Sequence, residues 1–130
     1  MEIWHGHIGA DGRPRLPLKI KGSVAKLEFE AVIDTGFTGF LYMPILASIP
    51  LGVFLESTSK VTLADGSVVT VLLAQFEVEV MGDKRKGWTM LDVGGGNDVL
   101  IGMEFMRNFS RVLQVDGMQG VSLIERDALR

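Results

Sequence analysis

The feature that most constrains this chain is a two-residue alternation of apolar and polar side chains, broken at glycine-containing turns. Leu16, Leu18 and Ile20 alternate with proline or lysine, and after Gly22-Ser23 the alternation resumes over residues 25–31. A period of two places one face of a strand in the core and the other in solvent. Glycine makes up 16 of the 130 residues, more than the usual share of ~7%. The pattern therefore predicts an all-β fold of short strands and tight turns.

Turn residues and apolar runs place the remaining elements. We expect a long hairpin over residues 61–80, because Asp65-Gly66 supplies the positive φ that a two-residue turn requires. Pro44 suits the first position of a helix, and Pro50 suits its end. The other strands are expected at 88–93, 98–102, 111–115 and 121–124, with a charged turn at 82–87 and short helices at 45–49 and 103–108.

Composition excludes several classes of function. The net charge of −3 and the pI near 5.3 give no broad positive field for nucleic acid. Cysteine is absent, which removes disulfides, cysteine zinc sites and thiol catalysis and suits a reducing compartment. No apolar run approaches the roughly 18 residues of a membrane helix, and the first residues lack a secretory pattern. We therefore expect one cytoplasmic domain over residues 1–130, with neither a nucleic acid nor a membrane as partner.

The segment with the most chemical content is Asp34-Thr35-Gly36, directly after the apolar pair Val32-Ile33. A carboxylate at the inner end of a buried strand is costly unless hydrogen bonds satisfy it. The Thr35 hydroxyl and the amides next to Gly36 are suited to this task, and glycine lets another backbone or a substrate approach closely. On the tripeptide alone, an ordinary turn aspartate is the commoner interpretation.

The order of motifs along the chain resembles that of the retropepsin-like aspartic proteases. Asp34-Thr35-Gly36 follows an apolar pair, the hairpin at Ala64-Asp65-Gly66 stands where a flap is expected, and Leu100-Ile101-Gly102 precedes a short helix. The likeness covers roughly residues 16–124, which is nearly the whole chain. It implies an all-β fold in which the strands close into a barrel, with one or two short helices.

By this resemblance the protein is an aspartic endopeptidase that acts on extended peptide or protein substrates. Hydrolysis of this kind uses two facing carboxylates that share one proton and activate a water molecule. Asp-Thr-Gly occurs once in the chain, so a homodimer is implied, in which each copy supplies Asp34. No cofactor or metal is implied. The implied catalytic residues are Asp34, Thr35 and Gly36, and the implied substrate-binding residues are Ala64, Asp65 and Gly66 at the flap tip, Phe37 and Ile101.

Phe37 relates the chain to one subgroup and separates it from others. Residues 34–39, with Leu41 and Pro44, look like the Asp-Thr-Gly-Phe subgroup of bacteria and archaea. Viral and pepsin-like members have a small residue in place of Phe37, and viral members often have an arginine where Met103 stands. These departures keep a second hypothesis open, a catalytically inactive peptide-binding or dimerisation module. A third hypothesis is a purely structural β domain.

Other polar residues carry weaker signals. His5 and His7 are potential metal ligands, but no carboxylate cluster lies nearby in the sequence, so solvent exposure is the simpler interpretation. Asp92, Asp98 and Asp116 are alternatives for a second acid within one chain. Asp98 precedes an apolar run but lacks a following Thr/Ser-Gly, so we interpret it as a structural turn residue.

Overall fold

The structure, a computed structural model, describes residues 2–53, 56–62, 64–118 and 120–129. Its strands are β1 (Ile3–His5), β2 (His7–Ile8), β3 (Pro14–Lys21), β4 (Lys26–Ile33), β5 (Leu41–Pro44), β6 (Ser57–Thr62), β7 (Val68–Val80), β8 (Asp83–Asp92), β9 (Leu100–Ile101), β10 (Arg111–Asp116) and β11 (Gly120–Glu125). Its helical segments are α1 (Ile45–Ser48), η1 (Ile49–Leu51), α2 (Met103–Asn108) and η2 (Arg126–Leu129). Within this described part, every helix is too short or too polar to span a membrane.

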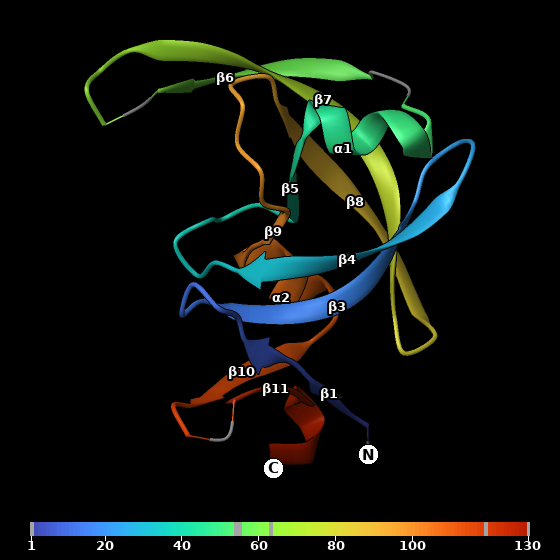
Figure 1. Cartoon of the computed structure of the whole chain (residues 1–130), viewed down its shortest axis with the longest axis vertical. Helices are drawn as coiled ribbons and strands as arrows, with labels where there is room; N and C mark the ends of the chain where they lie inside the picture. The colour runs from blue at the N-terminus through green and yellow to red at the C-terminus, as the bar shows by residue number, and fades with distance from the viewer. Residues whose placement is uncertain (1, 54–55, 63, 119, 130) are drawn as a thin grey trace.

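Six strands form a closed ring of hydrogen-bonded neighbours (Figure 1). Their order is β3-β4-β9-β5-β8-β7, and β7 pairs back onto β3. The pairs β4–β9 and β5–β8 are parallel, and the other pairs of the ring are antiparallel. This ring corresponds to the closed arrangement that the resemblance implies. Side chains from every strand of the ring form the core, among them Leu16, Leu18, Ile33, Leu41, Phe76, Val78, Leu91 and Ile101.

The first hairpin forms where the alternation predicts it. β3 pairs antiparallel with β4, and the predicted inward residues Leu16, Leu18 and Ile20 are buried. Leu27 differs from the prediction, because it is 40% exposed. β9 pairs only with the last two residues of β4, so the first half of β4 has a free edge, and continuous burial begins at Ala31.

The second hairpin differs from its prediction at the turn. β6 ends at Thr62, which lies opposite Val68, so the connection is longer than the two-residue turn that we expected. Asp65 Oδ1 accepts hydrogen bonds from the backbone N–H and the hydroxyl of Ser67, at 2.9 and 2.6 Å. Gly66 has a φ of 86°, which glycine adopts without steric cost. The aspartate and the glycine therefore shape a wider turn.

The prediction of a charged turn over residues 82–87 is wrong for most of these residues. β8 begins at Asp83, and its charged residues are part of the strand. Lys84 and Lys86 lie opposite Glu79 and Glu77 of β7. Because cross-strand pairs of opposite charge stabilise an antiparallel ladder, a run with the composition of a solvated turn forms a strand here.

The two predicted helices are present, and the first differs at its ends. Pro44 is the last residue of β5 and caps α1, instead of occupying its first position. After Ser48 the chain continues as η1, which contains Pro50. Proline is tolerated there because the first residues of a helix need no intrahelical N–H donor. The helix predicted over 103–108 is confirmed as α2.

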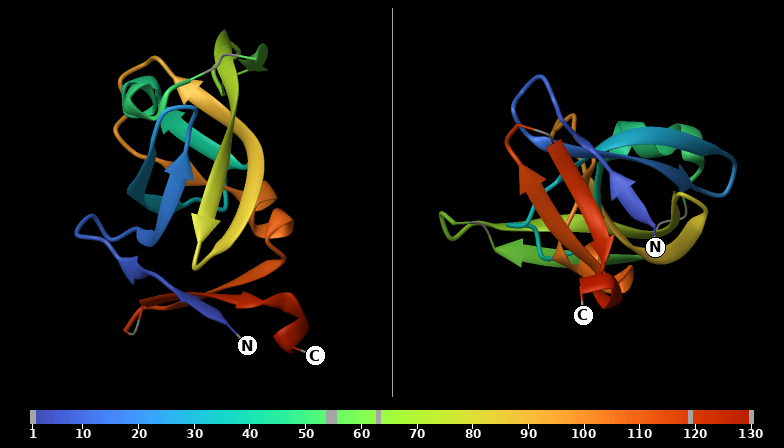
Figure 2. Two further views of the ribbon diagram at one scale, coloured as in Figure 1. Left: turned by 90° about the vertical axis from the view of Figure 1, so that its right-hand side faces the viewer. Right: turned by 90° about the horizontal axis from the view of Figure 1, so that it is seen from below.

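A separate three-stranded sheet, in the order β1-β11-β10, lies below the ring in the orientation of Figure 1 and in the first panel of Figure 2. The β10–β11 hairpin was predicted, whereas β1 and β2 were not. Arg111 fastens β1 to this sheet, because its Nη1 donates to the carbonyls of Glu2 at 2.9 Å and Leu123 at 3.3 Å. Its guanidinium also lies 3.8 Å from the ring centre of Trp4, within the range of a cation–π contact.

Candidate active site

Asp34 lies at the end of β4, where the short strand β9 runs alongside. Its backbone N–H donates to the carbonyl of Ile101 at 3.0 Å, and the N–H of Val32 donates to the carbonyl of Val99 at 2.8 Å. β9 lies between β4 and β5, so it joins the two strands that flank the loop. The Asp34 side chain is half-buried, whereas the three residues before it are buried. The acid therefore stands at the inner end of a buried strand, as predicted.

The loop after Asp34 is closed by backbone hydrogen bonds. Asp34 Oδ1 accepts from the N–H of Gly36 at 2.9 Å, which confirms the predicted amide partner. N–H groups at the start of α2 donate to the carbonyls of Phe37, Thr38 and Gly39 at 2.9 to 3.2 Å. The loop that carries the acid is thus docked on the first turn of α2.

Gly102 allows this docking because it has no side chain. A Cβ atom at this position would stand 2.4 Å from the carbonyl oxygens of both Phe37 and Gly39. We expect Gly102→Ala to lower the free energy of unfolding by about 2–4 kcal/mol, because the backbone around it cannot yield without moving the loop. Urea unfolding measures the effect. Gly117→Ala is the control, since a Cβ there meets nothing within 4 Å, and equal midpoints for the two variants would contradict the close approach.

Asp34 borders an open hollow of about 410 Å³. The lining is mainly apolar and consists of Arg13, Pro14, Val32, Ile33, Asp34, Thr35, Leu113 and Val115. The predicted catalytic residue Thr35 is exposed at its edge. Among the residues that the structure describes, Asp34 is the one carboxylate of this lining. A pair of acids that share a proton is therefore not formed in this hollow by one copy of the chain.

The residues predicted to form a flap do not line this hollow. Ala64, Asp65 and Gly66 form the connection between β6 and β7, and Leu63 next to them lies outside the described residues. The tip of this hairpin projects to the same side of the molecule as the loop after β4 (Figure 1). The pKa of Asp65 is lowered, mainly by the hydrogen bond from the Ser67 hydroxyl and then by that from its backbone N–H.

The two remaining predicted binding residues flank the acid from within the protein. Phe37 is half-buried, and its ring makes an edge contact with Tyr42, with ring centres 6.2 Å apart. Ile101 is fully buried and lies between Ile33 of β4 and Leu41 of β5. Both support the loop of Asp34 from the interior, and neither lines the hollow.

Two of the other acids that we considered form local contacts of their own. Asp92 Oδ1 accepts from the N–H of Gly94 at 2.7 Å, and the pKa of Asp92 is lowered, mainly by the hydrogen bond from the Tyr42 hydroxyl. Burial, and then the Asp92 carboxylate, raise the pKa of Tyr42 to about 12. Asp116 Oδ1 accepts from the N–H of Met118 at 2.8 Å. Neither acid lines the hollow with Asp34.

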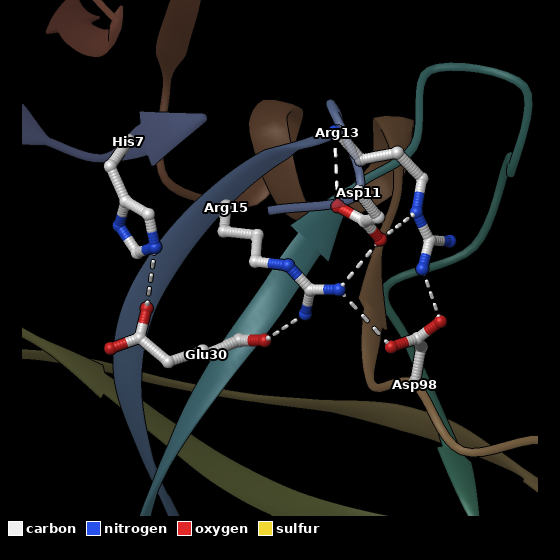
Figure 3. A network of polar contacts seen from close by, with 6 residues as sticks. All are labelled: His7, Asp11, Arg13, Arg15, Glu30 and Asp98. Atoms are coloured by element: carbon white, nitrogen blue, oxygen red, sulfur yellow. Dashed lines mark hydrogen bonds and ion pairs between the residues drawn. The ribbon is translucent and has the colours of Figure 1, made fainter. Parts of the chain in front are cut away.

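A group of four charged residues beside the hollow was missed by the sequence analysis (Figure 3). We call Asp11, Arg13, Arg15 and Asp98 the ion cluster. Arg13 Nε lies 2.7 Å from Asp11 Oδ2, and Arg13 Nη2 contacts Asp98 Oδ2. Arg15 Nη2 lies 2.9 Å from Asp11 Oδ2 and 3.4 Å from Asp98 Oδ1. Asp98, which we expected to be a turn residue, therefore contacts two arginines. Arg13 is 85 positions away in the sequence, so no local pattern indicates its contact with Asp98.

His5 and His7, the potential metal ligands near the N-terminus, are both exposed. His7 Nε2 lies 3.7 Å from Glu30 Oε2, on the far side of Arg15 from Asp98 (Figure 3). In the described ranges, no three or more histidine or carboxylate side chains come together as metal ligands.

Comparison with solved structures places this geometry in a known fold. The chain is similar to a retropepsin-like aspartic protease from Rickettsia conorii, with a TM-score of 0.62 and 19% identity, over 94% of this chain and 88% of that one. The fold is retropepsin-like. A second similar structure is the retroviral protease-like domain of Ddi1 from Leishmania major, with a TM-score of 0.52 and 13% identity, over 88% of this chain and 96% of that one. No protein-family model matches the sequence, and no curated protein matches it.

The retropepsin-like fold confirms the predicted fold class. The short strand β9 lies between β4 and β5 and brings the Leu100-Ile101-Gly102 run next to Asp34. Two of the three sequence motifs that suggested the resemblance, Asp34-Thr35-Gly36 and Leu100-Ile101-Gly102, are therefore adjacent in space, although they are far apart in the chain.

Proposed function

We propose that the protein is an aspartic endopeptidase of the Asp-Thr-Gly-Phe subgroup that hydrolyses extended peptides as a homodimer. The observation that carries the proposal is the place of Asp34 in a retropepsin-like fold, at the end of β4 and at the edge of an open hollow. Two carboxylates about 3 Å apart cannot both ionise readily, so a pair of Asp34 side chains shares one proton. The ionised member takes a proton from the attacking water, and the protonated member polarises the scissile carbonyl.

The second copy docks on the side of the molecule where three segments project together. These are the tip of the β6–β7 hairpin, the loop after β4 and the β10–β11 hairpin (Figure 1). β10 is an edge strand of the three-stranded sheet, and edge strands favour pairing with another chain. On β10, Val115 is 53% exposed and lines the hollow together with Leu113. A two-fold axis at this hollow buries apolar surface from both copies and brings their Asp34 side chains face to face.

The substrate lies between the two acids and the two flaps. Ala64, Asp65 and Gly66 at the tip of the β6–β7 hairpin close over an extended peptide and exclude water from the reacting bond. Backbone hydrogen bonds hold such a peptide, and its side chains alternate into pockets on either side. Thr35 and Gly36 complete the catalytic loop, and Phe37 and Ile101 support it from inside.

A peptide library and a statine peptide test the proposal together. The protein is expected to cleave some members of the library, and a statine-containing version of a cleaved sequence is expected to bind at least about 100-fold more tightly than the substrate, because it mimics the tetrahedral intermediate. Tight binding of peptides without any cleavage would favour the inactive peptide-binding module, for which Phe37 in place of a small residue is the motivating feature. If the protein neither binds nor cleaves peptides, the purely structural β domain is the remaining hypothesis.

A further inference from the structure

The ion cluster bridges the strands on either side of β4, the strand that directly precedes Asp34. Arg15 belongs to β3, and Asp98 immediately precedes β9. β4 lies between β3 and β9, with Val32 opposite both Arg15 and Leu100. The cluster therefore spans β4 next to its last residues (Figure 3), and its Arg13 lines the same hollow as Asp34.

β9 carries the hydrogen bonds that hold Asp34, although it is a strand of only two residues. The N–H groups of Val32 and Asp34 donate to the carbonyls of Val99 and Ile101. The chain before β9 contains three consecutive glycines at 94–96, and glycine has the largest backbone entropy to lose on ordering. A fixed point directly after this segment therefore limits how far β9 moves away from β4.

The contacts of the cluster supply such a fixed point. Both carboxylates bond both arginines, and Asp11 Oδ1 also accepts from the backbone N–H of Arg13 at 3.1 Å. Arg15 Nη1 donates to the carbonyl of Glu30 at 3.2 Å, which attaches the cluster to β4 itself. The side chains are partly exposed, so the ion pairs add little to global stability. Their effect is local, because they fix the start of β9 relative to β3 and β4.

The cluster stays ionised in mildly acidic solution. The pKa of Asp98 is lowered, mainly by the hydrogen bond from Arg13, and Arg13 lowers the pKa of Asp11 in the same way. The groups that face these carboxylates are Arg13 and Arg15. A carboxyl with a lowered folded pKa stabilises the fold above its unfolded pKa of ~3.9 and loses this contribution as the pH falls through the folded pKa. The contacts therefore persist above pH ~4.

We propose that the ion cluster positions the catalytic loop: Asp98, held by Arg13 and Arg15, fixes the start of β9 and thereby the backbone of Asp34. Asp98 and Arg13 are positioning residues in this proposal, since they act through β9 and not on the substrate. The catalytic consequence rests on the proposed peptidase function, whereas the effect on the backbone of Asp34 does not.

The test compares Asp98→Asn with Asp83→Asn. Asp83 forms an ion pair with Arg85 at the start of β8, and the exposed fractions of its two side chains, 33% and 42%, match those of Asp98 and Arg13, 33% and 45%. Amide hydrogen exchange is measured at Val32 and Asp34, whose N–H groups donate to the carbonyls of Val99 and Ile101. Exchange at these two amides is expected to become about tenfold faster in Asp98→Asn and to stay unchanged in Asp83→Asn. Arg13→Gln is the second variant, with the same expected local effect.

The effect on catalysis is measured by steady-state kinetics, with a peptide that the parent protein cleaves. Asp98→Asn is expected to lower kcat about tenfold with little change in KM, and Asp98→Glu is expected to restore most of the rate. Parent-like exchange in both cluster variants, or an equal acceleration in Asp83→Asn, would overturn the proposal. If the parent cleaves no peptide, the proposed function fails, and the exchange measurement still decides whether the cluster positions Asp34.

Discussion

Asp34→Asn is expected to lower the rate of peptide hydrolysis roughly 10³- to 10⁴-fold, because a carboxamide cannot take a proton from the attacking water. The fold is expected to survive the change. Asparagine has nearly the same shape, and its Oδ1 can still accept the hydrogen bond from Gly36 that Asp34 accepts at 2.9 Å. The measurement is the cleavage rate of a library-derived peptide, together with the urea midpoint and the oligomeric state of the variant.

Asp92→Asn is the matched control for this variant. Asp92 accepts the N–H of a glycine two positions later, at 2.7 Å, just as Asp34 does, but it lies outside the hollow. Its asparagine variant is expected to cleave within about twofold of the parent, since its carboxylate takes no part in the proton transfer. An Asp34→Asn protein that hydrolyses the peptide as fast as the parent would remove the basis for an aspartic peptidase.

Val115→Asp is expected to convert the proposed dimer to a monomer and to reduce cleavage at least about 100-fold. At a two-fold interface each substituted residue meets the same surface of its partner, so two uncompensated carboxylates would be buried in an apolar contact. The isolated copy tolerates the change, because Val115 is already 53% exposed. Analytical ultracentrifugation measures the mass, and the same peptide assay measures activity.

Val24→Asp is the control for the loss of an exposed valine. Val24 is 80% exposed in the connection between β3 and β4, and this connection is on the opposite side of the molecule from the loop after β4 (Figure 1). Its aspartate variant is expected to remain a dimer with parent-like activity. A dimer of unchanged stability in Val115→Asp would show that the two copies meet elsewhere.

The parts of the fold that were predictable from sequence are those specified by local patterns. The alternation at Leu16, Leu18 and Ile20 indicates which face of β3 is buried, and the apolar run before Gly102 indicates β9. The closure of the ring was not visible locally, because it depends on pairings between distant strands such as β4 with β9 and β5 with β8. β1 was missed because three residues are too few to show a period.

The candidate site divides in the same way. The hydrogen bond from the Gly36 amide to Asp34 was predictable, because the two residues are only two positions apart. The docking of the loop on α2 and the contacts of Asp98 with Arg13 were not, because these residues meet only after the strands between them have paired. The charges of β8 were misread for a related reason, since Lys84 and Lys86 are explained by glutamates on the neighbouring strand.

The pairing of β1 with β11, in which Ile3 lies opposite Ile124, imposes an order on folding. β1 has no partner in its sheet until β11 has been synthesised, and contacts between segments so far apart in the sequence form late. The side chain of Trp4, which is buried in the folded protein, therefore stays exposed to solvent until this sheet has formed.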